Sequence, residues 1–223
     1  METPAHSPEI EALVAAFARE RACAILRCAD REVGRQAMDA ALAGGFRLVE
    51  VTLTTPGALA LIAELATRPG VTVGAGTVLT VDQAEAAVAH GARFVVSPVT
   101  DFAVIQRAAE LGVAALPGGH TPSELLAAHR AGAPLLKLFP APAGGPAWLR
   151  SLLAPLPFLK VVPTNGTDPD NAADWLAAGA YALGFGATLF QPDDLRQRRF
   201  DRVEERARLI LSRVRPQPAA VGS

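Results

Sequence analysis

One lysine of this chain lies inside an apolar segment. Only two lysines, Lys137 and Lys160, occur among 21 basic residues. In PLLKLFP, strand alternation places Lys137 on the opposite face from Leu136 and Leu138. An ammonium group is costly to bury, so an interior lysine tends to become a neutral nucleophile that can form a Schiff base with a ketone. The alternative is a lysine that is merely paired with a buried carboxylate.

A carboxylate lies in a second apolar segment. In RLVEVTLTTP, Glu50 has Val49 and Val51 on either side and therefore points away from both, toward the same interior as Lys137. A lone carboxylate is expensive there, so the two charged groups are expected to meet. They would form either a structural ion pair or a nucleophile with its general acid/base, and we favour the catalytic interpretation.

Further polar groups and glycines follow other apolar segments. Arg27 ends ACAILR, and its guanidinium could hold a substrate carboxylate; a salt bridge at the rim is the alternative. Thr77 offers a hydroxyl after the glycine-rich TVGAG, although tight packing explains those glycines equally well. Gly166, Gly184 and Gly186 fit a backbone nest for phosphate in two late loops. No basic side chain accompanies these glycines in the sequence, so plain turns are the alternative.

The elements that carry these residues recur along the chain. A helix end, a glycine and a short apolar run follow one another in AGGFRLVEV, AHGARFVVSP and RAGAPLLKLF. The apolar runs return at the spacing of one βα unit, and amphipathic segments separate them. Eight strands that alternate with eight helices favour a (β/α)8 TIM barrel over an open doubly wound α/β sheet.

The length and the pattern predict a single domain over residues 1–223. Half of the 223 residues are apolar, and no linker divides the chain. An extra N-terminal helix is expected over 9–20, another helix over 201–213, and a frayed tail over 216–223. Lys160, at the start of its strand, is expected to have a structural role.

Charge and cysteine usage argue against several partners. A net charge of −1 leaves no basic surplus for nucleic acid or an anionic membrane. The N-terminus lacks the pattern of a secretory signal, and charges interrupt every apolar stretch before it reaches membrane-spanning length. Cys23 and Cys28 have neither redox-motif nor zinc-site spacing, so we expect no metal and a cytoplasmic protein.

Eight segments carry a resemblance to a known family: AILR, VEVTLTTP, GAGTVL, SP, PGGHTPSE, LKLFPA, PTNGTDPDN and GFGATLF. Together and in this order, the chain resembles the 2-keto-3-deoxy-6-phosphogluconate (KDPG) and 4-hydroxy-2-oxoglutarate (KHG) aldolases, with the 6-phosphogalactonate aldolases as close relatives. The resemblance covers essentially the whole chain. It implies a class I aldolase without metal or other cofactor, a homotrimer of barrels whose small-molecule substrate is a 2-keto-3-deoxy acid.

The resemblance also implies roles for individual residues. Lys137 would be the Schiff-base lysine and Glu50 the proton shuttle. Thr77, Pro98 and Thr164 would line the pocket for pyruvate.

Three positions depart from the family pattern. Thr54 stands where many phosphogluconate-type members carry an arginine that holds the substrate carboxylate, and Arg27 is expected to replace it, as in the phosphogalactonate branch. Asn165 and Ala187 stand in place of a Gly and a Ser that usually help to bind the phosphate, so an unphosphorylated substrate is an alternative. The expected phosphate contacts are Asn165, Gly166, Gly186 and Ala187.

The predicted enzyme is a lyase that cleaves a 2-keto-3-deoxy sugar acid to pyruvate and an aldehyde. The substrate would be of the 6-phosphogluconate or 6-phosphogalactonate type, or 4-hydroxy-2-oxoglutarate. One alternative is a sugar-phosphate isomerase or epimerase that uses Glu50 as a base without a covalent bond to Lys137. Another is a non-catalytic barrel that binds sugar acids.

Overall fold

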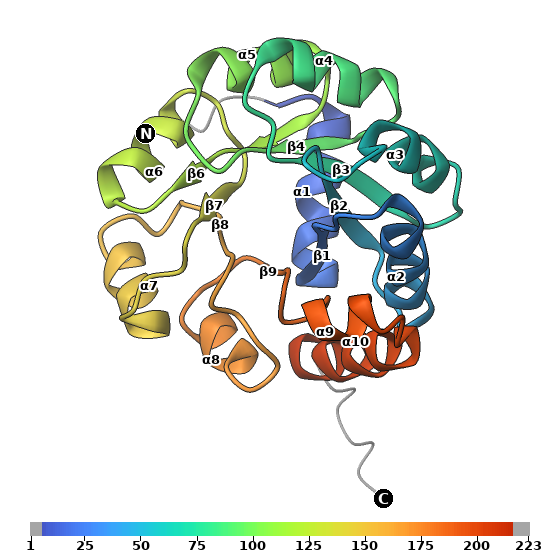
Figure 1. The fold of residues 1–223 in the computed structure, drawn as a ribbon. Helices are drawn as coiled ribbons and strands as arrows, with labels where there is room; N and C mark the ends of the chain where they lie inside the picture. The colour runs from blue at the N-terminus through green and yellow to red at the C-terminus, as the bar shows by residue number, and fades with distance from the viewer. Residues whose placement is uncertain (1–5, 216–223) are drawn as a thin grey trace, which may run out of the picture.

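Helices and strands alternate around a ring in the computed structural model, which describes residues 6–215 (Figure 1). The strands are β1 (Ala22–Leu26), β2 (Leu48–Thr52), β3 (Thr72–Gly76), β4 (Phe94–Val96), β5 (Ala114–Leu116), β6 (Gly118–Gly119), β7 (Leu136–Leu138), β8 (Val161–Pro163) and β9 (Leu183–Phe185). The helices are α1 (Pro8–Glu20), α2 (Arg31–Ala43), α3 (Ala58–Ala66), α4 (Val81–Ala89), α5 (Phe102–Glu110), α6 (Pro122–Arg130), α7 (Gly145–Leu153), α8 (Ala172–Ala177), α9 (Pro192–Arg196) and α10 (Phe200–Val214).

The strands form a curled parallel sheet in two arcs. One arc has the order β5-β4-β3-β2-β1-β9, and the other has the order β6-β7-β8. Pro117 separates β5 from β6, and its carbonyl accepts the N–H of Lys137 at 2.9 Å. A parallel bridge between Thr164 and Gly184 joins the segment after β8 to β9. The alternation of apolar strands with helices has therefore produced an α/β fold with its helices outside the sheet (Figure 1).

Strand alternation places successive side chains either in the core beneath the helices or toward the interior of the sheet. Val49 and Val51 of β2 belong to the larger core, which packs against the helices, and Glu50 between them faces the interior cavity. Lys137 likewise lies between two outward-facing leucines of β7. The predicted inward orientation of both charged residues is confirmed.

Helix α1 covers the amino-terminal side of the sheet. Its Phe17 is fully buried and meets the ring of Phe94 edge to face, with centroids 5.3 Å apart. Tyr181, which precedes β9, donates its hydroxyl to the carbonyl of Val14 at 3.3 Å. The cavity at the carboxyl ends of the strands lies on the other side of the sheet from this helix.

The observed element boundaries lie close to the predicted ones. The helix expected over 9–20 is α1, and the helix expected over 201–213 is α10, each longer by one residue at one or both ends. The expected tail, 216–223, lies outside the described residues, and a single domain over the whole chain stays a prediction. Within residues 6–215, no helix has both the length and the apolar character needed to cross a bilayer.

Candidate active site

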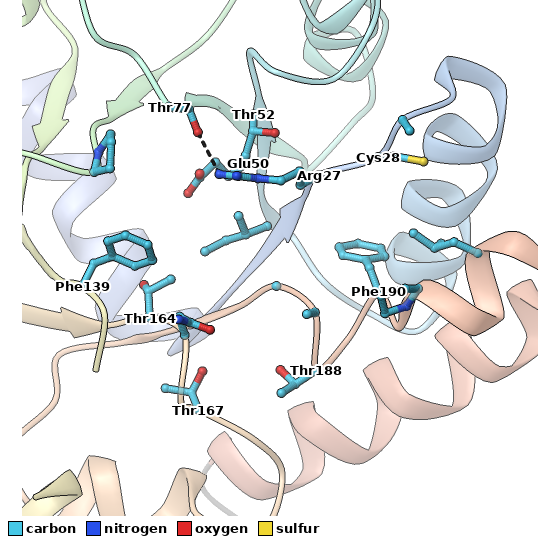
Figure 2. Close-up of a pocket in the computed structure, with 18 of the residues that line it drawn as sticks. Arg27, Cys28, Glu50, Thr52, Thr77, Phe139, Thr164, Thr167, Thr188 and Phe190 are labelled. Atoms are coloured by element: carbon cyan, nitrogen blue, oxygen red, sulfur yellow. Dashed lines mark hydrogen bonds between the residues drawn. The ribbon is translucent and has the colours of Figure 1, made fainter. Parts of the chain in front are cut away.

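A cavity of about 860 Å³ opens at the carboxyl ends of the strands (Figure 2). Its lining comes from β1, β2 and β7 and from the segments that follow β3, β4, β8 and β9. The carboxyl ends of parallel strands meet on one face, which brings together residues that are distant in the sequence. Gly184, expected in the phosphate nest, lies within β9 and does not line this cavity. The cavity is lined by the other residues that the sequence nominated: Arg27, Glu50, Thr77, Pro98, Lys137, Thr164, Asn165, Gly166, Gly186 and Ala187.

The amine of Lys137 is held within this cavity. Lys137 is only 8% exposed, and its position on β7 is fixed by parallel pairing with Gly118 on one side and Val162 on the other. Its Nζ lies 4.8 Å from the centroid of the Phe139 ring, an arrangement in which the ring face attracts a cation. The strand therefore presents a buried amine at the wall of the cavity, where a bound ketone could reach it.

Glu50 brings a buried carboxyl group to the same cavity. The side chain is 3% exposed, and its Oε1 has no hydrogen-bond partner among residues 6–215. Burial raises the pKa of Glu50, while the positive charges of Lys137 and Arg27 oppose that rise. A carboxyl whose pKa is moved toward neutrality can both accept and return a proton, which is the property of a general acid/base.

Two glycines make room for these side chains. A Cβ at Gly76 on β3 would lie 1.9 Å from Oε1 of Glu50, and a Cβ at Gly184 on β9 would lie 2.5 Å from Oγ1 of Thr164. Both distances are far shorter than real side chains allow. Gly76 is one of the glycines of TVGAG that the sequence explained equally by close approach or by tight packing, and here the close packing leaves space for Glu50. Gly184, which was predicted to join a phosphate nest, packs against Thr164.

Arg27 and Thr77 form a hydrogen bond at the mouth of the cavity. Nη2 of Arg27 donates to Oγ1 of Thr77 at 3.2 Å, which Figure 2 marks with a dashed line. Thr77 has a φ of 58°, in the left-handed region that a β-branched residue rarely adopts. Strain of this kind is typical of functional sites. A guanidinium has five N–H donors, so Arg27 can bond to Thr77 and still face a carboxylate.

The loops after β8 and β9 form the other wall of the cavity. Asn165 and Gly166 have φ angles of 61° and 124°, which turn their backbone sharply. The side-chain amide of Asn171 donates to the carbonyl of Gly166 at 2.9 Å and so holds this turn.

No basic residue accompanies these loops in the sequence, but two arginines from farther along the chain line the same cavity. They are Arg196, at the end of α9, and Arg198, which follows α9. Arg196 is ion-paired with Asp193 of the same helix.

The sequence and the course of the chain are similar to those of known proteins. The family model described as "KDPG and KHG aldolase" matches residues 14–206. The chain belongs to this aldolase family. It is 39% identical to a probable 2-dehydro-3-deoxy-6-phosphogalactonate aldolase of Rhizobium meliloti (strain 1021), over 78% of this chain and 86% of the relative. It is 41% identical to a 2-dehydro-3-deoxy-phosphogluconate aldolase of Pseudomonas aeruginosa, over 66% of this chain and 69% of the relative.

Solved structures of aldolases of this type have the same fold. A native KDPGal structure superposes with a TM-score of 0.79 at 31% identity and covers 86% of this chain and 92% of the other. A KDPG aldolase from Legionella pneumophila, with pyruvate captured as a covalent carbinolamine intermediate, gives a TM-score of 0.81 at 28% identity, over 88% and 97%.

Sequence reasoning missed part of the cavity of this aldolase. Thr52 lines it on the same face of β2 as Glu50, and its Oγ1 is 3.2 Å from that of Thr55. The alternation that identified Glu50 would also have found Thr52, two residues later. Phe190 and Arg198 also line the cavity, but their positions depend on how the last segments fold, for which the sequence holds no local signal.

Proposed function

We propose that this aldolase is a class I enzyme that cleaves a 2-keto-3-deoxy acid to pyruvate and an aldehyde through a Schiff base on Lys137. The observation that carries the proposal is the pairing of a buried amine with a buried carboxyl group in one cavity. Membership of the aldolase family supports it independently.

In the first step the neutral amine of Lys137 attacks the C2 ketone of the substrate. The nitrogen lone pair forms the C–N bond, and one proton passes from the nitrogen to the C2 oxygen. A second proton, taken from solvent and given back in the final hydrolysis, lets that oxygen leave as water, which yields an iminium ion. Arg27 would hold the C1 carboxylate with its remaining donors. Thr77, Pro98 and Thr164 would surround the part of the substrate that becomes pyruvate.

Glu50 then acts as the proton shuttle. Its carboxylate takes the C4 hydroxyl proton, directly or through a water, and the C3–C4 bond breaks. The bonding electrons move toward the iminium nitrogen, which leaves an enamine and releases the aldehyde. Glu50 returns the proton to C3, and water hydrolyses the new iminium to pyruvate and the free amine of Lys137.

The substrate class is a 2-keto-3-deoxy sugar acid of the 6-phosphogluconate or 6-phosphogalactonate type, or 4-hydroxy-2-oxoglutarate. The names of the relatives support the phosphorylated acids. A phosphate would lie against the turn backbone of the loops after β8 and β9, at Asn165, Gly166, Gly186 and Ala187.

The two arcs of the sheet would close into a (β/α)8 barrel, and three copies would form a homotrimer in the cytoplasm. Closure is supported by the parallel bridge from Thr164 to Gly184 and by the hydrogen bond from Lys137 to the carbonyl of Pro117. A trimer would cover apolar side chains that are exposed after β3, after β4 and at the start of α5, namely Leu79, Val99 and Phe102.

Replacing each lysine in turn tests the proposed mechanism. Lys137→Met keeps an apolar stem and removes the nucleophile, so release of pyruvate from 2-keto-3-deoxy acids should fall by about three orders of magnitude or more. Lys160→Met is the matched control, because Lys160 lies over the ring of Tyr181, 5.6 Å from its centroid and away from the cavity. Normal turnover by Lys137→Met would exclude the mechanism.

A further inference from the structure

Three threonine hydroxyl groups are joined by hydrogen bonds at the carboxyl end of β2. Oγ1 of Thr52, which lines the cavity, lies 3.0 Å from Oγ1 of Thr54 and 3.2 Å from Oγ1 of Thr55. Thr52 and Thr55 are buried, and Thr54 is exposed. The proposed reaction uses none of these hydroxyl groups, although buried polar groups that form a connected network usually have a structural or functional reason.

One end of this network reaches the backbone beside Arg27. The N–H of Cys28 donates to Oγ1 of Thr55 at 3.3 Å. On the other side of Arg27, Leu26 pairs with Val51 in the last position of the parallel register between β1 and β2. The backbone of Arg27 therefore lies between two contacts with the same neighbouring segment, one made by the strand and one made by a threonine side chain.

The hydroxyl protons of the network have one arrangement that satisfies both buried groups. Oγ1 of Thr55 accepts the N–H of Cys28, and among residues 6–215 its other hydrogen-bond partner is Thr52. Thr55 must therefore donate its own proton to Thr52, because a buried hydroxyl without an acceptor is costly. Thr52 then donates to Thr54, whose own proton can reach solvent. This order leaves a lone pair of Thr55 directed at the N–H of Cys28.

The side chain of Arg27 has little else to hold it. Arg27 is exposed, and within the described part of the chain its one side-chain hydrogen bond is that to Thr77, at 3.2 Å. A long exposed side chain loses rotamer freedom when it binds an anion, and the paired bonds from a guanidinium to a carboxylate require a defined geometry. The place of the guanidinium thus depends strongly on where its backbone is fixed.

We propose that Thr55 is a positioning residue for the binding of the substrate carboxylate, an inference that rests on the proposed function. Its hydroxyl group, oriented by Thr52, holds the backbone that follows Arg27, so that the guanidinium meets the C1 carboxylate in a fixed place. Thr55 does not line the cavity, and its effect passes through Arg27. Its loss should weaken binding of the carboxylate and leave the steps at Lys137 and Glu50 unchanged.

The first test removes the hydroxyl group of Thr55. Thr55→Val should raise KM for a 2-keto-3-deoxy acid about fivefold or more and leave kcat within about twofold of wild type. Thr55→Ser, which restores the hydroxyl group, should have a KM close to that of wild type. A fall in kcat with an unchanged KM, or a serine variant that is as impaired as the valine variant, would overturn the inference.

A matched control loses the same kind of bond elsewhere. Oγ1 of Thr80 accepts the N–H of Gln83 at 3.2 Å at the start of α4, outside the cavity lining. Thr80→Val should therefore leave KM unchanged. An equal rise of KM in Thr80→Val and Thr55→Val would show that the effect is a general result of losing such a bond, and would contradict the positioning role.

A double-mutant cycle tests whether the effect passes through Arg27. Arg27→Met keeps an unbranched side chain and removes the guanidinium. Thr55→Val should lower kcat/KM about fivefold in the wild-type background and less than about twofold in Arg27→Met, because no guanidinium is left to position. Equal losses in the two backgrounds would show that Thr55 acts independently of Arg27 and would exclude the proposal.

Binding of pyruvate separates failure of the positioning role from failure of the proposed function. Calorimetry with pyruvate in the Lys137→Met background requires no Schiff base. Adding Thr55→Val should weaken binding about fivefold, whereas adding Thr80→Val should not. Such a loss would support the positioning role even if pyruvate never formed a covalent bond to Lys137. Equal affinities with and without Thr55→Val would exclude the positioning role even if the enzyme used a Schiff base.

Discussion

Lys137 and Glu50 are both buried, although water would stabilise the charged form of each side chain. The protein offsets part of this cost by placing each group in the field of the other, since the positive charge of Lys137 lowers the pKa of Glu50 against the effect of burial. Because burial is the larger influence, the pKa of Glu50 remains raised. A carboxyl in this condition exchanges protons near neutral pH more readily than an ordinary glutamate.

The pH dependence of cleavage should report the raised pKa of Glu50. Glu50 must be ionised to accept the C4 hydroxyl proton, so kcat should fall at low pH with a midpoint above the ordinary glutamate value of about 4.3. Glu50→Gln should lower kcat by about a hundredfold to ten-thousandfold and remove this acid limb. Steady-state pH profiles of kcat for the wild type and Glu50→Gln test this prediction. An acid limb that persists in Glu50→Gln would show that another group titrates there.

The same group should influence stability with a defined sign. Because the pKa of Glu50 is raised on folding, the folded state holds the proton more tightly than the unfolded state. The resulting stabilisation is complete below about pH 4.3 and is lost as pH rises through the raised pKa. Thermal melts should therefore show Glu50→Gln gaining stability relative to wild type as pH increases through this window. A difference that is constant, or that changes in the opposite direction, would be inconsistent with a raised pKa.

At the scale of elements, a glycine of β3 leaves space for the carboxyl group of Glu50 on the neighbouring strand β2. Gly76→Ala would place a methyl group 1.9 Å from Oε1 of Glu50 and displace it, so kcat should fall at least about tenfold. Gly74→Ala on the same strand is the control, since its methyl would meet the ring of Phe94 at 2.3 Å instead. That variant should lose about 1 to 3 kcal/mol of stability with a smaller change in kcat.

Chemical denaturation and turnover are measured on both glycine variants. Together they show whether Gly76 positions the Glu50 carboxyl group for catalysis or only contributes to packing. If Gly74→Ala lost as much activity per unit of lost stability as Gly76→Ala, the close approach of Gly76 to Glu50 would have no special part in catalysis.

Elements set by short-range patterns could be predicted from the sequence. Alternation in VEV and LKL was sufficient to orient Glu50 and Lys137, because a strand exposes successive side chains to opposite faces. The lining by Arg198 depends instead on where α9 and the residues after it pack, and the left-handed conformation of Thr77 contradicts the preference of its residue type. Both result from tertiary packing, which no window of the sequence contains.

For the whole molecule, the proposed trimer should depend on the exposed apolar residues near the carboxyl ends of the strands. Phe102 is 58% exposed at the start of α5, and Phe102→Glu should reduce the mass in solution from three chains toward one. Leu209→Glu, at a residue 44% exposed on α10, is the matched control and should remain trimeric. Analytical ultracentrifugation measures the mass of each protein. A monomeric wild type would contradict the trimer, and a trimeric Phe102→Glu would show that the interface lies at other residues.

Covalent capture of pyruvate tests the central claim most directly. Borohydride reduces the C=N bond of a Schiff base and fixes pyruvate to the amine that formed it. The chain has only two lysines, so peptide mass spectrometry after incubation with pyruvate and borohydride resolves Lys137 from Lys160 without ambiguity. We predict one adduct, on the Lys137 peptide, and none in Lys137→Met. An adduct on Lys160, or no adduct where calorimetry detects bound pyruvate, would contradict Schiff-base catalysis by Lys137.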